Sequence, residues 1–361
     1  MILFITRHYP PRHRNGGSLQ REQFIKFLAG EGIHSDVVIL DNTKNKIWEK
    51  IKLQFQKIGL SIDFMQLPKI TTELRKQYSC VVSTTGGELG TIYHADKVAG
   101  MLGIPHIVIM RDPIVHSIFM FRSGLRRFLY GRRNKLLAEV LKRADRVFCS
   151  GEQLASEVVS LLNINSSKVE ALFFGYGSEN PMPNNQHYER REVISLVYGG
   201  TARRAQKLEN FIRDFLISSE QETLQIFTND KIKGSIRVHV KPLVSKRKFL
   251  SQLEIGKDVG LIVLGNSYFS SCIPSKFYDF VSQKIPILCY SVDGELRQLV
   301  ERTGFGVCVQ FGNHLALGEA IKALNTEIYD EIVERISNNL SDFEMGACHL
   351  SLLSQIRAYE Q

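Results

Sequence analysis

The chain has 361 residues, of which 43% are hydrophobic and 23% are charged. These fractions are those of a globular protein and exclude collagen-like, coiled-coil and wholly disordered chains. The formal net charge of +9 favours anionic partners: nucleotides, nucleic acid or an anionic membrane face. At roughly 100–200 residues per domain, the length predicts two domains.

The first half of the chain alternates short apolar runs with longer helical stretches. The runs are continuous and β-branched, which is typical of strands buried on both faces of a parallel sheet. Strand–helix alternation of this kind predicts right-handed crossovers and helices on both faces of the sheet. The predicted strands are Ile2–Arg7, Asp36–Leu40, Cys80–Thr85, His106–Arg111, Arg146–Ser150 and Val169–Phe174.

The second half repeats this pattern after a polar, proline-bearing stretch without periodicity, which we take as a linker over 179–191. The expected organisation is a Rossmann-like domain over 1–178, a second over 192–340, and a helical tail over 341–361 that could pack back on the first domain. Two facing sheets would place a ligand between the domains, at the carboxyl ends of the strands. The second series of predicted strands is Ile194–Tyr198, Leu224–Thr228, Val238–Leu243, Val259–Leu264, Pro286–Tyr290 and Gly306–Phe311.

The six cysteines are scattered and include no Cys-x-x-Cys pair, which disfavours a disulfide scaffold or a zinc ribbon. They predict reduced thiols in a cytoplasmic protein. The apolar start Ile2–Ile5 is too short for a signal peptide, and no apolar run approaches the roughly 18 residues of a transmembrane helix. We therefore expect a soluble protein, or one attached to a membrane from outside.

Two loops of the first domain carry candidate functional residues. After the first strand, Gly16 and Gly17 precede a helix whose N-terminus could hold a phosphate or a sugar hydroxyl; a simple glycine turn with Ser18 as the cap is the alternative. After the fourth strand, Asp112 could act as a general base toward an attacking hydroxyl, or form a salt bridge or a turn before Pro113. His116 is a weaker candidate base.

The loop after the first strand of the second domain combines glycines with cations. Gly199 and Gly200 are followed by Arg203, Arg204 and Lys207, a set that suits a diphosphate clamp. A solvated basic helix start is the alternative. It is weakened because cations at a helix N-terminus oppose the dipole unless an anion is present.

A second candidate anion site follows further along the same domain. In the run Pro274–Phe280, Pro274 is placed to begin a helix with Ser275 and Lys276 in its first turn. Asp279, one helical turn later, could accept hydrogen bonds from ribose hydroxyls. Beyond the next strand, Gly294 and Glu295 open another helix whose amides could hold a sugar or a phosphate.

The runs Pro274–Phe280 (Pro-Ser-Lys-Phe-Tyr-Asp-Phe), Lys284-x-Pro286 and Asp293–Glu295 resemble family 4 of the retaining glycosyltransferases, which have the GT-B fold. The likeness is to the branch with a Pro-Ser-Lys-x-Tyr-Glu/Asp motif. Tyr9–Gly17, the pair Arg111-Asp112 and the run Ala144–Val147 are also similar to that branch, so the resemblance spans roughly residues 1–310.

The resemblance implies a nucleotide-sugar donor held mainly by the second domain. Asp279 stands where the family has its ribose-binding glutamate; Ser275 and Lys276 would lie by the diphosphate, with Arg203 or Lys207. Asp112 or its neighbourhood would serve the acceptor. The sequence departs from the family at Ser271, where the first carboxylate of the usual Glu-x7-Glu pair is missing.

Two basic segments of the first domain interleave cations with aromatic residues. One surrounds Trp48 in Lys46–Lys57; the other is Arg122–Lys135, in which cations such as Arg133 alternate with aromatic residues such as Phe128. Such segments suit an anionic membrane surface, at about 1 kcal/mol per basic residue, although aromatic residues facing the core beneath a solvated basic face would look the same. No zinc-finger or RNP-type sequence is present, so a nucleic-acid partner is not expected.

We therefore expect a cytoplasmic GT-B glycosyltransferase, peripheral on the inner face of the membrane. It would move a hexosyl or N-acetylhexosaminyl group from a nucleoside-diphosphate sugar to a glycan or lipid-linked glycan, with retention, in surface polysaccharide biosynthesis. Arg203 and Lys276 would stabilise the leaving diphosphate, with no metal and no cofactor. A nucleotide-sugar epimerase of the related fold and a non-catalytic, membrane-associated subunit are the alternatives. A dehydrogenase is disfavoured because no Gly-x-Gly-x-x-Gly follows the first strand.

Overall fold

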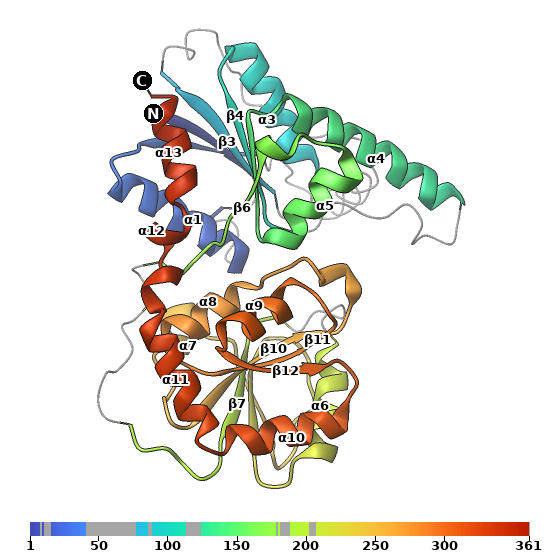
Figure 1. Cartoon of the computed structure of the whole chain (residues 1–361), viewed down its shortest axis with the longest axis vertical. Coiled ribbons are helices and arrows are strands. Elements are labelled where there is room, and N and C mark those ends of the chain that lie inside the picture. The colour runs from blue at the N-terminus through green and yellow to red at the C-terminus, as the bar shows by residue number, and fades with distance from the viewer. Residues whose placement is uncertain are drawn as a thin grey trace. The chain divides into compact units, whose positions relative to one another are not determined.

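The computed structural model describes residues 1–7, 9–10, 16–40, 77–85, 89–112, 124–177, 180, 188–201 and 207–360. The chain divides into two compact units, which Figure 1 draws together. The first comprises Met1–Phe173 and His349–Gln361, and the second comprises Phe174–Cys348.

The first unit is built on a six-stranded sheet of order β2-β1-β3-β4-β5-β6, and every neighbouring pair of strands is parallel. Strands β1, β3 and β4 are buried along their whole length because helices cover the sheet, which explains why they contain no charged residue and are rich in Val and Ile. The strands are β1 (Ile2–Thr6), β2 (Ser35–Ile39), β3 (Cys80–Thr85), β4 (His106–Met110), β5 (Arg146–Cys149) and β6 (Val169–Ala171).

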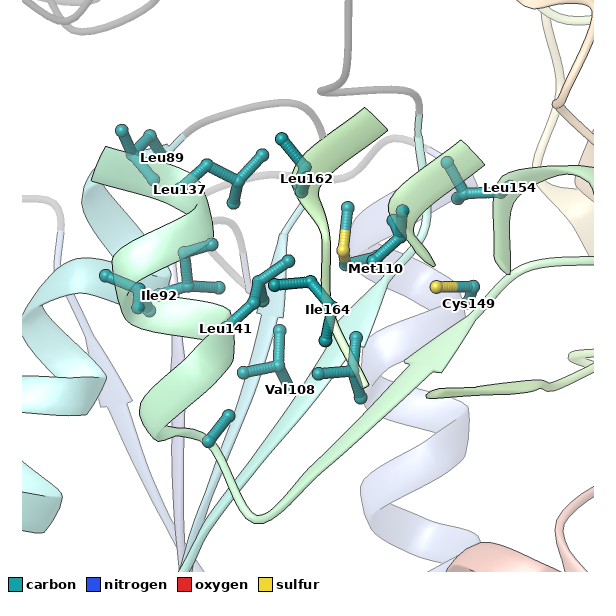
Figure 2. Packing of buried hydrophobic residues seen from close by; sticks show 14 residues of the cluster. Leu89, Ile92, Val108, Met110, Leu137, Leu141, Cys149, Leu154, Leu162 and Ile164 are labelled. Carbon is teal, nitrogen blue, oxygen red and sulfur yellow. The ribbon is translucent and has the colours of Figure 1, made fainter. Parts of the chain in front are cut away.

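Helices of the first unit pack their apolar sides on this sheet. Figure 2 shows one cluster, in which Leu137 and Leu141 lie with Ile92 and Val108, all buried. Helix α5 closes the same cluster with Leu154 and Leu162. The helices are α1 (Gly16–Gly30), α3 (Leu89–Leu102), α4 (Gly124–Arg143), α5 (Glu152–Leu162) and the short η3 (Ser166–Lys168).

The C-terminal helix α13 (Leu350–Ala358) also belongs to the first unit. Arg357 forms an ion pair with Glu31 at 3.0 Å, and the amino group of Met1 lies 3.1 Å from a carboxylate oxygen of Glu360. Leu352, Leu353 and Ile356 are buried. The two ends of the chain therefore lie side by side (Figure 1).

The second unit contains another six-stranded parallel sheet, of order β12-β11-β10-β7-β8-β9. From β7 the chain adds strands toward one edge, and from β10 it adds them toward the other. The order reverses between β7 and β10, and ligands of open α/β sheets bind outside the strand ends at such a point. The strands are β7 (Ser195–Gly199), β8 (Thr223–Phe227), β9 (Val238–Lys241), β10 (Asp258–Leu264), β11 (Ile287–Ser291) and β12 (Gly306–Gln310).

Large aromatic side chains and glycines shape the core of the second unit. A Cβ on Gly260 would lie 2.4 Å from the ring of Phe280, so α8 packs directly on the backbone of β10. Phe277 stacks on Phe305 with ring centroids 6.4 Å apart. The helices are α6 (Leu208–Ser218), α7 (Lys246–Leu250), η5 (Ser267–Phe269), α8 (Ser275–Ser282), α9 (Glu295–Thr303), α10 (His314–Leu324), α11 (Ile328–Asn338), η6 (Leu340–Phe343) and α12 (Met345–Cys348).

The predicted α/β class with two parallel sheets is confirmed, and each predicted strand is found. Most boundaries agree within one or two residues; the run predicted as Val169–Phe174 is strand only over Val169–Ala171. This strand lies at the edge and pairs with β5 alone, and β5 itself ends at Cys149. All six cysteines are free thiols. Among the described residues, no helix is long and apolar enough to span a membrane.

Candidate functional site

Lys276 lies across the end of strand β7. Its Nζ is 4.3 Å from the centroid of the Tyr198 ring. A Cβ on Gly200 would lie 3.2 Å from Lys276 Cε and 3.4 Å from Nζ, and Gly200 has φ +122°, which side-chain-bearing residues rarely adopt. Glycine at this position therefore leaves room for the lysine to reach the sheet edge.

Helix α8 begins where the sequence predicted. Pro274 is its N-cap residue, and Ser275 and Lys276 occupy the first turn. The N-cap residue makes no side-chain capping hydrogen bond. The positive end of the helix dipole favours an anion here, and Lys276 adds a full positive charge. The arrangement suits a phosphate group.

Lys207 reaches the same sheet edge from the other side of the strand-order reversal. It is the N-cap residue of α6, in the left-handed conformation (φ 55°), and its Nζ lies 5.2 Å from the centroid of the Phe311 ring. A Cβ on Gly265, directly after β10, would lie 2.4 Å from the Phe311 ring and 3.0 Å from Lys207 Cβ. The loops after β7, β10 and β12 thus meet around one lysine.

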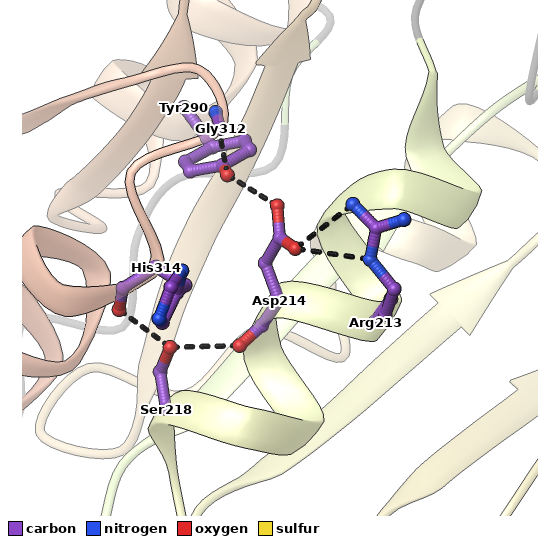
Figure 3. Close-up of polar contacts among 6 residues, drawn as sticks. All are labelled: Arg213, Asp214, Ser218, Tyr290, Gly312 and His314. Carbon is purple, nitrogen blue, oxygen red and sulfur yellow. Dashed lines mark hydrogen bonds and ion pairs between the residues drawn. The ribbon is translucent and has the colours of Figure 1, made fainter.

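A buried hydrogen-bond network supports these loops (Figure 3). The Tyr290 hydroxyl donates to Asp214 Oδ2 at 2.6 Å and accepts from the backbone N–H of Gly312 at 2.8 Å. Burial and the Asp214 carboxylate raise the pKa of Tyr290, so the phenol stays protonated. Asp214 also pairs with Arg213 at 3.2 Å. No local sequence pattern predicts this network, because its members lie far apart along the chain.

Asp279 is already paired in the structure. Its Oδ1 lies 2.6 Å from Lys246 Nζ, with 15% of the Asp279 side chain and 22% of the Lys246 side chain exposed. Asp279 therefore carries a compensated charge on the same helix as Lys276. Lys246 was not among the predicted site residues.

The start of helix α9 is more closely packed than its sequence suggested. A Cβ on Gly294 would lie 2.1 Å from the carbonyl oxygen of Ser270, and the N–H of Glu295 donates to that same oxygen at 2.6 Å. The Glu295 amide, expected to be available to a ligand, is thus already used. Glu295 is itself buried, as is Ser271, which stands where the related family has its first carboxylate.

The predicted residues of the first unit are only partly described. Gly16 and Gly17 begin helix α1, and Asp112 follows β4 with an exposed side chain. The end of that strand is fixed by Ser150, whose hydroxyl donates to the Arg111 carbonyl at 2.7 Å. His116 and Trp48 lie outside the described residues, as do Arg203 and Arg204 of the second unit.

Some residues of the basic segment that ends at Lys135 are exposed and others are buried. On α4, Phe128 is 67% exposed, and Arg132 and Lys135 are exposed as well. Arg133 is instead buried, with 2% exposure, so it does not contribute to a basic surface as expected. Arg122 lies outside the described residues. Across the described part of the chain, no cluster of histidine, cysteine and carboxylate side chains could hold a metal ion.

Comparison with solved structures identifies the fold. The chain matches Anabaena HepE in complex with UDP-glucose with a TM-score of 0.67 at 10% identity, over 99% of both chains. It matches WaaG, a glycosyltransferase involved in lipopolysaccharide biosynthesis, with a TM-score of 0.65 at 11% identity, over 99% of both chains. Sucrose-phosphate synthase from Thermosynechococcus elongatus gives a TM-score of 0.65 at 14% identity, over 99% of this chain and 98% of that one.

No family model matches the chain, and no curated protein matches it by sequence. The structural matches nevertheless cover 99% of the chain, and the proteins matched are GT-B glycosyltransferases. The chain therefore has the GT-B fold.

Proposed function

We propose that the protein is a glycosyltransferase that takes a sugar from a nucleoside-diphosphate donor bound by the second unit. The observation that carries the proposal is the position of Lys276 and Lys207. Both lie at the carboxyl edge of the second sheet, beside the glycines that follow β7 and β10. Cations fixed beside a helix N-terminus suit a diphosphate.

In this proposal, positioning and charge stabilisation carry the catalysis. Lys276 and Lys207, with Arg203 and Arg204, neutralise the charge that grows on the diphosphate as the sugar leaves. Gly200 lets Lys276 approach the diphosphate, and the backbone amide of Ser275 binds a phosphate oxygen. These cations stabilise the leaving diphosphate in place of a metal ion, so activity is expected to persist in EDTA.

The remaining predicted residues serve the two sugars. Asp279 binds the donor ribose, and the loop at Gly294 and Glu295 lies against the transferred sugar. In the first unit, Gly16 and Gly17 contact the ligands, and Asp112 receives the proton of the acceptor hydroxyl. We propose transfer of a hexosyl or N-acetylhexosaminyl group with retention of configuration.

The proposed acceptor is a glycan or lipid-linked glycan in surface polysaccharide biosynthesis. The exposed Phe128, with Arg132 and Lys135 on the same helix, supports contact of the first unit with an anionic membrane at the inner face. The structurally similar WaaG is a glycosyltransferase involved in lipopolysaccharide biosynthesis, which favours this class of acceptor. Salt-sensitive co-sedimentation with anionic liposomes tests the contact; equal recovery with neutral liposomes contradicts it.

The function is tested with the purified chain and a set of nucleoside diphosphates and nucleotide sugars. Calorimetry is expected to detect binding of one nucleoside diphosphate. The protein is also expected to release that diphosphate from the corresponding nucleotide sugar, both with and without EDTA. Interconversion of donor sugars without diphosphate release would indicate an epimerase. Binding without any turnover would favour a non-catalytic subunit, in keeping with the buried Ser271 where the family has a carboxylate.

A further inference from the structure

Two of the six free cysteines face each other across neighbouring strands of the second sheet. Cys289 of β11 and Cys308 of β12 are direct partners in the parallel register of these strands, so their side chains lie on the same face of the sheet. The Cys308 thiol donates to the carbonyl oxygen of Arg297 at 3.6 Å, which places this face under α9. Neighbouring strands lie about 4.8 Å apart, within the Cα separations that a disulfide spans.

The surroundings of the pair favour a thiolate on Cys289. A hydrogen bond from the Cys308 thiol lowers the pKa of Cys289, against the opposite effect of burial. The Ser291 hydroxyl oxygen, 3.3 Å from the Cys289 sulfur, and the charge of Arg297 lower the same pKa further. The hydrogen bond to Cys289 and burial raise the pKa of Cys308. The pair therefore combines one nucleophilic sulfur with one protonated sulfur.

Cys308 is the accessible member of the pair. In the described part of the sheet, β12 is the edge strand and pairs only with β11. Cys308 is half-buried, whereas Cys289 has no exposed surface. A small oxidant that approaches the sheet edge therefore meets Cys308 first, with a second sulfur directly behind it.

The pair lies next to the loop that contacts Lys207. Phe311 follows Cys308 by three residues, and the centroid of its ring lies 5.2 Å from Lys207 Nζ. Tyr290, on β11, holds the same loop by accepting a hydrogen bond from the backbone of Gly312 at 2.8 Å (Figure 3). A disulfide brings its two Cβ atoms to about 3.8 Å, closer than strands about 4.8 Å apart hold them. A cross-link therefore draws β12 toward β11 and shifts the ring that Lys207 contacts.

We propose that Cys289 and Cys308 form a reversible thiol–disulfide site whose oxidation weakens donor binding. The effect on the donor rests on the proposed function. With hydrogen peroxide, the Cys308 sulfur forms a bond to oxygen as the O–O bond breaks, and one water leaves. The Cys289 sulfur then displaces that oxygen: the S–S bond forms, the S–O bond breaks, and a second water leaves. The two thiols lose two electrons and two protons, the peroxide is reduced to two waters, and a dithiol reductant reverses the change.

The site is tested by treating the full chain with hydrogen peroxide, blocking the remaining thiols and mapping disulfides by mass spectrometry. A peptide pair linked through Cys289 and Cys308 is expected in the wild type, and dithiothreitol is expected to remove it. Phenylarsine oxide, which bridges two close thiols, is expected to bind the reduced protein and to protect both cysteines from alkylation. Cys308→Ser is expected to abolish both results. Cys348→Ser, which removes another half-buried thiol, is the matched control and is expected to change neither.

The effect on the donor is tested by calorimetry with UDP and GDP before and after oxidation. Oxidation is expected to weaken the binding of the preferred nucleotide about three- to tenfold in the wild type and in Cys348→Ser. In Cys308→Ser the same treatment is expected to leave the affinity unchanged. Dithiothreitol is expected to restore the affinity of the oxidised wild type.

The outcomes separate this inference from the function on which it rests. Absence of both the Cys289–Cys308 peptide and the arsenical bridge overturns the site. A disulfide that leaves the affinity unchanged overturns its effect on the donor. Failure of every nucleotide to bind the reduced protein overturns the proposed function and the effect on the donor, while the peptide map still decides whether the disulfide forms. Thermal melting establishes that each variant is folded; should Cys308→Ser not fold, Cys289→Ser takes its place.

Discussion

Tyr290 is hydrogen-bonded at once to Asp214, at 2.6 Å, and to the backbone of Gly312, at 2.8 Å. Asp214 belongs to the helix that Lys207 caps, and Gly312 follows Phe311, whose ring lies against Lys207. One phenol therefore joins the two chain segments whose side chains meet at the cation–aromatic contact. The Tyr290 hydroxyl thereby fixes the distance between these two segments.

Tyr290→Phe is expected to lower the free energy of unfolding by about 1–3 kcal/mol, because it leaves Asp214 buried with one hydrogen bond fewer. Urea unfolding measures the loss. Tyr188→Phe is the matched control: its hydroxyl donates to Asp330, which is 42% exposed, so water can replace the bond and the cost is smaller. An equal loss of unfolding free energy in the two variants would contradict the expectation that the buried hydrogen bond contributes more than the exposed one.

Lys276→Ala is expected to weaken nucleoside-diphosphate binding by about ten- to a hundredfold, since a charge-assisted hydrogen bond contributes about 1.5–3 kcal/mol. Turnover is expected to fall as well. Lys322→Ala, which removes a lysine with 75% exposure from α10, is the control for the loss of net charge. Calorimetry and initial rates give both readings, and unchanged values for Lys276→Ala would remove this residue from the site.

Gly265→Ala is expected to reduce both stability, by about 1–3 kcal/mol, and donor affinity. The added methyl group would meet the Phe311 ring at 2.4 Å and Lys207 Cβ at 3.0 Å, so both must move. Gly100→Ala, on the exposed side of α3, meets nothing within 4 Å and is expected to stabilise by about 0.5–1 kcal/mol. Undisturbed binding by Gly265→Ala would show that Phe311 and Lys207 can shift without consequence.

Asp258 makes stability depend on pH. Burial raises the pKa of this carboxyl from 3.8 to about 6, so ionising it disfavours the folded state. Because the folded state holds this proton more tightly than the unfolded state, Asp258 contributes to the free energy of unfolding. That contribution is complete below the unfolded-state pKa and is lost as pH rises through about 6. From pH 5 to pH 8, wild type is expected to lose roughly 1–2 kcal/mol relative to Asp258→Asn. Urea unfolding of both proteins at both pH values measures this difference; parallel pH profiles would exclude it.

The strands could be predicted because most are short apolar runs between turn residues, as in Val259–Leu264, which the structure shows as β10 with one residue more at its start. The N-terminus of α8 could be predicted for a similar local reason, since Pro274 fixes where the helix starts. Lys276 stood out because its charge opposes the helix dipole.

The residue pairs that build the candidate site could not be predicted as well from the sequence. Asp214 and Tyr290 are 76 positions apart, and no local pattern links them. Lys246 carried a usable signal, since it follows the N-cap Ser245 and lies in a first turn, as Lys276 does. Its partner could not be predicted because the contact depends on how Phe249 packs against Phe280.

The C-terminal helix α13 completes the first unit after the chain has built the second. Since the amino group of Met1 lies 3.1 Å from Glu360, the two ends could be joined by a short linker. A circular permutant opened before Phe174 would then carry each unit as one uninterrupted stretch, 174–348 followed by 349–361 and 1–173. In such a rearranged gene the two halves would be separable by a single cut, which the natural order of the chain prevents.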